Sequence, residues 1–305
     1  MKKGLLWGCG GIFSDYIHLI KLYEILNKFK IIGVTSKNII YSEIMGYECI
    51  DKKDVMNKEF DFVIIMVKDN VYNEIFNEAL ELGIARECIF SYRVLKHYNF
   101  DLNKYMELKK NPPSIFSNNC WGGNTYHSLN MEFMSPLINM YENDMDYLKL
   151  LQAPKRYFEE KLELVEMGYN KESKIDFPIV KCGDIVLNFN HYSSFEMAVE
   201  CWERRKKRID WNNIFVMMYT ENKEIAKEFV KLPYQKKVCF VPFETEEPGL
   251  VYVDLVKGMP EIPFYQIVNG MANGRYPYYD VIDLLKETKI TKVVAMRDFV
   301  DGVCV

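Results

Sequence analysis

The sequence lacks the features that would assign it to several large classes of protein. Lysine and arginine total 39 against 43 aspartates and glutamates, a net charge of -4, so no excess of positive charge indicates a nucleic-acid partner. No run of about 18 apolar residues occurs, and the apolar stretch before Cys9 is too short for a signal sequence. We expect a cytoplasmic protein that neither binds nucleic acid nor inserts into a membrane.

Histidine is scarce and the cysteines follow no pairing pattern. None of the four histidines is close to another in the sequence, and no C-x-x-C motif is present. The eight cysteines are spread almost evenly, at Cys9, Cys49, Cys88, Cys120, Cys182, Cys201, Cys239 and Cys304. We therefore predict reduced cysteines and no metal site.

Hydrophobic periodicity predicts an α/β fold in two domains. In the first hundred residues, continuous apolar runs such as "DFVIIMV" alternate with amphipathic segments, as in parallel sheets with helices on both faces. The segment "KKNPPSI", with Pro112 and Pro113, is the expected joint, and the alternation then resumes. We predict a Rossmann-like, mostly parallel domain over residues 1–108 and a second α/β domain over residues 109–305.

The first glycine loop, "GLLWGCGGIF", is an incomplete dinucleotide-binding fingerprint. Gly8, Gly10 and Gly11 follow a predicted strand and precede a helix, where backbone can approach a phosphate, but Phe13 replaces the third glycine of G-x-G-x-x-G. The acidic residue expected after the second strand is also missing, which disfavours NAD. A cofactor site and a purely structural turn remain equal alternatives, and no cofactor is assigned.

The second loop, "SNNCWGGN", again joins a predicted strand to a helix. Asn118 and Asn119 carry the donors and acceptors that recognise hydroxyls, and the flanking residues offer ring faces or close backbone approach. We predict substrate contacts from Trp121, Gly122, Gly123 and Tyr126 in addition to the two asparagines. A helix N-terminus at this loop would lower the pKa of Cys120, although a buried small apolar role for this cysteine is an alternative.

The motif "HYSSFEMAVECWERRKKRIDW" predicts a helix that begins beside His191 and Tyr192, with Ser193 and Glu196 as a capping box. His191 follows an apolar strand and is the best candidate for a general base, with a structural histidine as the alternative. The cations of the helix either complement its dipole or clamp a phosphate. The candidates for such a clamp are Arg204, Arg205 and Arg208, and Tyr192 is a further predicted substrate contact.

The motifs "SNNCWGG", "SPLINMY", "HYSSFEMAVECWERRKKRIDWNN" and "LPYQKKVCF" resemble a bacterial domain family of unknown function found in capsule and exopolysaccharide biosynthesis. The resemblance covers roughly residues 113–240 and implies a pathway context without a reaction. It favours a transferase that acts on an activated sugar or a phosphorylated glycan precursor, with Cys120 and His191 as catalytic residues and a sugar or nucleotide sugar as substrate.

Two other functions remain open from the sequence. One is a non-catalytic partner or sensor with a degenerate nucleotide-binding fold, and the other is a nicotinamide-dependent oxidoreductase. If the second loop is a site, Asn118 and His191 should follow neighbouring strands of one parallel sheet, because the carboxyl ends of such strands share an edge.

Overall fold

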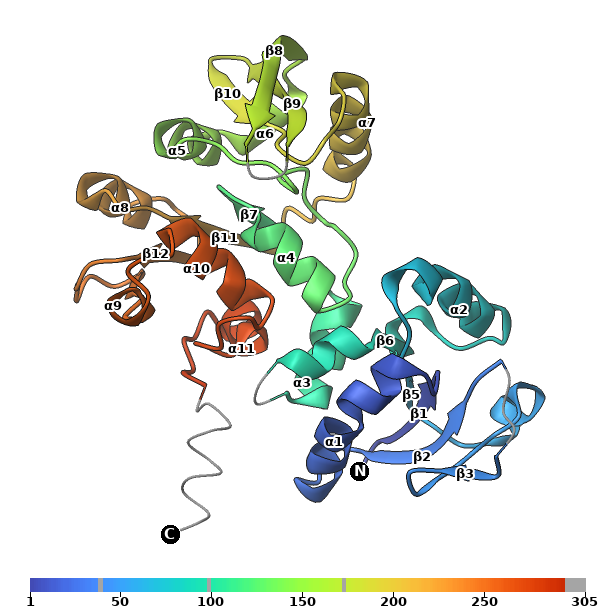
Figure 1. The fold of residues 1–305 in the computed structure, drawn as a ribbon. Helices are drawn as coiled ribbons and strands as arrows, with labels where there is room; N and C mark the ends of the chain where they lie inside the picture. The colour runs from blue at the N-terminus through green and yellow to red at the C-terminus, as the bar shows by residue number, and fades with distance from the viewer. Residues whose placement is uncertain (38–40, 98–99, 172–173, 294–305) are drawn as a thin grey trace. The chain divides into compact units, whose positions relative to one another are not determined.

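The computed structural model describes residues 1–37, 41–97, 100–171 and 174–293 and divides them into two compact units (Figure 1). Unit 1 comprises Met1–Asn111, Ser128–Asn130 and Val293, and unit 2 comprises Pro112–His127 and Met131–Lys292. Both units contain a parallel sheet accompanied by helices, which confirms the predicted α/β class.

Unit 1 is built on a four-stranded parallel sheet of order β2-β1-β5-β6. Its strands are β1 (Lys3–Trp7), β2 (Lys30–Thr35), β5 (Phe62–Ile65) and β6 (Ile89–Ser91), and its helices are α1 (Gly11–Ile25), α2 (Asp69–Glu81) and α3 (Leu102–Lys110). A short hairpin, β3 (Glu43–Ile44) and β4 (Tyr47–Glu48), and the 3-10 turns η1 (Lys52–Asn57), η2 (Arg86–Cys88) and η3 (Tyr92–Lys96) complete the unit. All four residues of β5 are buried, which explains its uninterrupted apolar run.

Unit 2 contains two sheets. The parallel sheet has the order β13-β12-β11-β7, with β7 (Ser114–Ser117), β11 (Ile214–Tyr219), β12 (Lys237–Val241) and β13 (Leu250–Tyr252). The second sheet is antiparallel, in the order β10-β9-β8, with β8 (Leu162–Asn170), β9 (Ile175–Cys182) and β10 (Ile185–Asn188). The hydrophobic core of unit 2 includes Phe116 and Val216 of the parallel sheet and Val180 and Leu187 of the antiparallel one, so one core holds both sheets together.

The helices of unit 2 are α4 (Trp121–Ser128), α5 (Asp144–Gln152), α6 (Pro154–Glu159), α7 (Phe195–Lys206), α8 (Lys223–Val230), α9 (Leu255–Gly258), α10 (Phe264–Ala272) and α11 (Val281–Glu287). Helix α5 packs on β10 and α7 on β9, while α8 packs on β12. The N-cap of α7 is Ser194, whose hydroxyl accepts from the Met197 N–H, so the cap lies one residue after the predicted Ser193.

Candidate functional site

The carboxyl end of β7 is fixed to its neighbour β11 by Asn118. The side-chain amide of this fully buried asparagine donates to the Tyr219 carbonyl (2.9 Å) and accepts from the Tyr219 N–H (3.1 Å). The same amide lies 3.5 Å from Oδ1 of Asp144. Asn118 therefore positions the sheet edge and the start of α5, and its hydrogen-bonding groups are already used.

The turn after β7 places Cys120 at the start of helix α4. Oδ1 of Asn119 accepts from the Trp121 N–H (3.0 Å), and the Ser117 hydroxyl accepts from the Gly122 N–H (3.1 Å). These side chains satisfy amides of the first helical turn, which would otherwise have no partner within the helix. These hydrogen bonds therefore fix the conformation of the turn that carries the Cys120 thiol.

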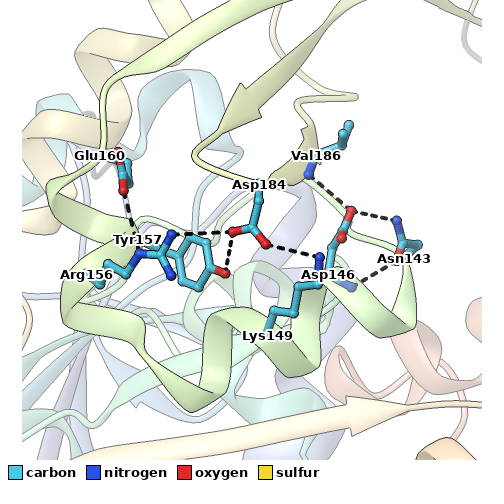
Figure 2. A network of polar contacts seen from close by, with 8 residues as sticks. All are labelled: Asn143, Asp146, Lys149, Arg156, Tyr157, Glu160, Asp184 and Val186. Atoms are coloured by element: carbon cyan, nitrogen blue, oxygen red, sulfur yellow. Dashed lines mark hydrogen bonds and ion pairs between the residues drawn. The ribbon is translucent and has the colours of Figure 1, made fainter.

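Helices α5 and α6 hold the hairpin between β9 and β10 (Figure 2). Asp184, in the hairpin turn, accepts from the hydroxyl of Tyr157 (2.7 Å) and from Nζ of Lys149 (3.2 Å), while Oδ2 of Asp146 accepts from the Val186 N–H (3.1 Å). These contacts orient β10 and so fix the direction in which the chain leaves it toward residue 191.

The structure brings Cys120 and His191 together. Sγ of Cys120 lies 3.3 Å from Nε2 of His191, within hydrogen-bonding distance for sulfur, and the side chain of Asn190 also hydrogen-bonds to the thiol. The sequence prediction of how they meet is wrong, because β10 belongs to the antiparallel sheet and not to the parallel sheet that contains β7. The pairing arises because the two sheets share one core.

Burial sets the protonation states of this pair. It raises the pKa of the Cys120 thiol to about 11, with a smaller opposing contribution from the Asn190 hydrogen bond and a further increase from the charge of Glu142. The expected lowering by the helix N-terminus is therefore outweighed. His191 is exposed at the surface, but partial desolvation of its ring beside the thiol lowers its pKa. At neutral pH a neutral thiol therefore faces a neutral imidazole.

Glu142 is a site residue that no sequence motif indicates. It is 4% exposed, and no described residue donates a hydrogen bond to either of its carboxyl oxygens. Burial raises its pKa to about 8. The residue's own backbone N–H has a smaller, opposing effect on this pKa, and it donates to the Asn118 carbonyl (3.4 Å). The loop "YEND" has no hydrophobic period and no motif, so only the three-dimensional structure reveals this residue.

The chain between β7 and α5 brings Glu142 to the thiol. Tyr141 and Asn188 exchange two backbone hydrogen bonds of 3.0 Å, which join this segment to the end of β10, two residues before Asn190. Cys120, Asn190, His191 and Glu142 thus form one group of side chains within unit 2, which we call the thiol cluster.

A pocket of about 590 Å³ lies at the carboxyl end of β11, lined by Asp144, Tyr219, Thr220, Glu221 and Asn222. Two of these residues, Asp144 and Tyr219, contact Asn118. Asn118 precedes Cys120 by two residues in the chain, so these contacts place the pocket beside the thiol cluster.

The predicted aromatic contacts are used inside the protein. Trp121 and Tyr126 are completely buried. The Trp121 ring stacks on Phe215, and its N–H donates to the Tyr279 hydroxyl (2.8 Å). The Tyr126 hydroxyl donates to the Pro113 carbonyl (2.6 Å). Contrary to the prediction, neither ring presents an accessible face to a ligand in this structure.

The two glycines of the loop serve close packing. A Cβ at Gly122 would lie 2.7 Å from Oγ of Ser117, and one at Gly123 would lie 3.1 Å from Oδ1 of Asn139. The small size of both residues therefore allows α4 to pack closely on its neighbours. The structure explains the two glycines by this packing, whereas the sequence predicted a close approach of the backbone to a ligand.

The basic helix does not supply a free clamp. Arg205 is buried, donates to the Tyr192 hydroxyl and covers the Phe133 ring. The Tyr192 hydroxyl donates to the Ile138 carbonyl (2.7 Å). Arg204 pairs with Glu200 (3.4 Å) and Arg208 with Glu132 (3.1 Å). Tyr192 and the three arginines thus have partners within the protein, so the predicted substrate contacts find no support.

In unit 1 the glycine loop has one constrained position and two open ones. Gly8 has a φ of +117°, and a Cβ there would lie 2.9 Å from the Met66 carbonyl oxygen, so a glycine is required for structural reasons. Around Gly10 and Gly11 a Cβ would meet nothing within 4 Å. Cofactor binding by this loop stays a prediction.

The described residues contain no group of three or more potential metal-ligating side chains. Among their helices, none combines the length and apolar character needed to cross a bilayer. The seven described cysteines are free, and Cys304 lies outside the described residues.

The fold and the thiol cluster define an α/β protein whose second unit pairs a cysteine with a histidine. The chain belongs to the family described as domain of unknown function (DUF1919), whose model matches residues 91–286. A second model, "C2185-like, N-terminal", matches residues 1–90. The predicted membership of a family of unknown function is confirmed.

Two proteins are similar to parts of this chain. An uncharacterized protein of Haemophilus influenzae (strain ATCC 51907 / DSM 11121 / KW20 / Rd) is 30% identical over 200 residues, which are 63% of this chain and 93% of that protein. A crystal structure of a dehydrogenase (MviM) from Clostridium difficile matches 61% of this chain and 68% of its own at 13% identity, with a TM-score of 0.26.

Proposed function

We propose that this protein is a thiol-dependent transferase in polysaccharide biosynthesis, with Cys120 as nucleophile and His191 as general base. The observation that supports the proposal is the distance of 3.3 Å between Sγ of Cys120 and Nε2 of His191. A nucleophile within hydrogen-bonding distance of a base is the arrangement that covalent acyl transfer requires. The polysaccharide context comes from the family resemblance of the loop and helix motifs.

The neutral state of the pair favours base-assisted attack over a preformed thiolate. With the imidazole proton on Nδ1, Nε2 accepts the thiol proton while Sγ bonds to the carbonyl carbon of an ester or thioester donor. The bond from that carbon to the donor oxygen or sulfur breaks, and His191 returns the proton to the leaving group. An acceptor hydroxyl then loses its proton to His191 and attacks the acyl-enzyme, and the Cys120 thiol leaves with the proton.

The acceptor in this proposal is a sugar unit of a glycan precursor. The pocket beside the thiol cluster is lined by polar side chains that can bond hydroxyls, including those of Tyr219 and Glu221. The pocket also contains Asp144 and Glu221, which disfavour a phosphate group at this position.

The proposal is tested with p-nitrophenyl acetate as a chemical acyl donor, followed by intact-mass measurement and peptide mapping. We expect one acetyl group on Cys120 in the wild type and none at this position in Cys120→Ala. The matched control is Cys88→Ala, which removes a half-buried cysteine of unit 1 and should leave the acetylation of Cys120 unchanged. Acetylation of Cys120 no faster than that of Cys88 would overturn the proposal.

A further inference from the structure

Four buried polar atoms without a hydrogen-bond partner belong to residues close to the Cys120 thiol. They are Oε1 and Oε2 of Glu142, Oδ1 of Asn190 and Nδ2 of Asn119. Asn119 precedes Cys120 in the chain, and the Asn190 side chain hydrogen-bonds to the thiol. The backbone N–H of Glu142 donates to the carbonyl of Asn118 (3.4 Å), which places Glu142 at the turn that carries Cys120. Each unpaired buried group lowers stability, by an amount comparable to a lost hydrogen bond or more, so a ligand that pairs these groups on binding gains stability from them.

The three side chains present both kinds of hydrogen-bonding atom. Asn190 offers an acceptor and Asn119 a donor, and a protonated Glu142 offers one donor and one acceptor. A hydroxyl group both donates and accepts, so a ligand with two or more hydroxyls can satisfy all of them. An ammonium group donates only, which would leave Nδ2 of Asn119 without a partner.

The charges around the cluster exclude an anionic group at this position. The charge of Asp146 raises the pKa of Glu142, and Asp144 and Glu221 line the neighbouring pocket. The arginines of α7 are paired with Glu200 or with the Tyr192 hydroxyl instead. A phosphate beside Glu142 would therefore meet carboxyl groups and no compensating cation among the contacts of the described cluster.

We infer that Glu142, Asn119 and Asn190 form a recognition site for a neutral, polyhydroxylated sugar ring, which holds the acceptor next to the Cys120 thiol. This inference rests on the proposed function and specifies the acceptor. Glu142 is a binding residue in it and takes no part in bond formation. The cost of its unpaired carboxyl group in the free protein is offset when the ligand binds.

The inference predicts a specific combination of stability and binding in Glu142→Leu. Leucine removes a buried polar group that has no partner, so the melting temperature without ligand should equal or exceed that of the wild type. The probes are methyl hexopyranosides, with the corresponding hexose 6-phosphates and hexosamines as comparisons. In the wild type we expect at least one methyl hexopyranoside to raise the melting temperature by about 3–5 °C at about ten times its Kd, and the charged analogues to do less.

Glu142→Leu should lose this rise, and Glu142→Gln, which keeps one donor and one acceptor function, should retain part of it. The inference is overturned if Glu142→Leu lowers the melting temperature without ligand, because Glu142 would then be structural. It is also overturned if no methyl hexopyranoside raises the wild-type melting temperature, or if Glu142→Leu keeps the full rise.

The variant Cys120→Ala separates this inference from the proposed function. It should keep the sugar-induced rise while it loses acetylation by p-nitrophenyl acetate. A rise that depends on Glu142 in a protein whose Cys120 is never acetylated would contradict the proposed function alone. Acetylation of Cys120 together with a rise that does not depend on Glu142 would contradict the inference alone.

Discussion

The buried carboxyl group of Glu142 makes the stability of unit 2 depend on pH. Its pKa is about 8 in the folded protein against an ordinary value of 4.5, because burial penalises the charged form. The folded state therefore binds more protons than the unfolded state between these two values, and the free energy of unfolding falls as the pH rises from about 4.5 to about 8. At about 1.36 kcal/mol per pH unit, the loss between pH 5 and pH 8 is about 3 kcal/mol.

Replacing Glu142 with glutamine removes this titration and keeps the shape of the side chain. The difference in unfolding free energy between Glu142→Gln and the wild type should increase in favour of the variant by about 3 kcal/mol from pH 5 to pH 8. Urea titration followed by tryptophan fluorescence suits the measurement, because Trp121, Trp202 and Trp211 lie in unit 2 and only Trp7 lies in unit 1.

The control is Glu166→Gln on β8, which removes the same charge from an exposed position. It should leave the pH dependence close to that of the wild type. A difference between Glu142→Gln and the wild type that stays constant from pH 5 to pH 8 would refute the reasoning, because Glu142 would then titrate alike in both states.

Two further predictions concern packing and hydrogen bonding. Gly122→Ala should destabilise unit 2 by about 1–3 kcal/mol, because its Cβ would lie 2.7 Å from Oγ of Ser117, whereas Gly11→Ala, with open space around it, should stabilise unit 1 by about 0.4–1 kcal/mol. Equal effects of the two alanines in urea titrations would contradict this. Trp121→Phe and Tyr279→Phe each break the same 2.8 Å hydrogen bond, so the double variant should lose less than the sum of the single losses, and additive losses would show that the bond contributes nothing.

The sequence was sufficient for the fold class because buried parallel strands have a strong signature. The runs of β5 and β11 are almost entirely apolar and lie between amphipathic helices. The antiparallel sheet was not predicted, since most residues of β8 are exposed and its sequence lacks alternation. Its strand β10 was recognisable as a strand, but nothing within the strand shows which sheet it joins.

The sequence indicates a site residue only where a reactive side chain directly follows a predicted strand. Cys120 and His191 are recognisable because each follows a strand. The prediction that their strands belong to one parallel sheet is wrong, because β7 and β10 lie in different sheets. Trp121 was misjudged because a loop aromatic next to glycines has the same sequence signature whether it is exposed or buried. Glu142 could not be predicted, because its role depends on burial without partners, which is a property of the assembled core.

The most direct test of the central claim is the rate at which iodoacetamide alkylates Cys120 at neutral pH, measured by peptide mapping in the wild type and in His191→Gln. A thiol with a pKa of about 11 is almost fully protonated at pH 7 and reacts slowly unless a base takes its proton. The account predicts that His191→Gln lowers the rate by about 10²-fold, in the range of general-base contributions. The control His18→Gln replaces an equally exposed histidine of unit 1 and should leave the rate unchanged. Equal rates in the wild type and His191→Gln would contradict the account, because the imidazole would then have no effect on the thiol beside it.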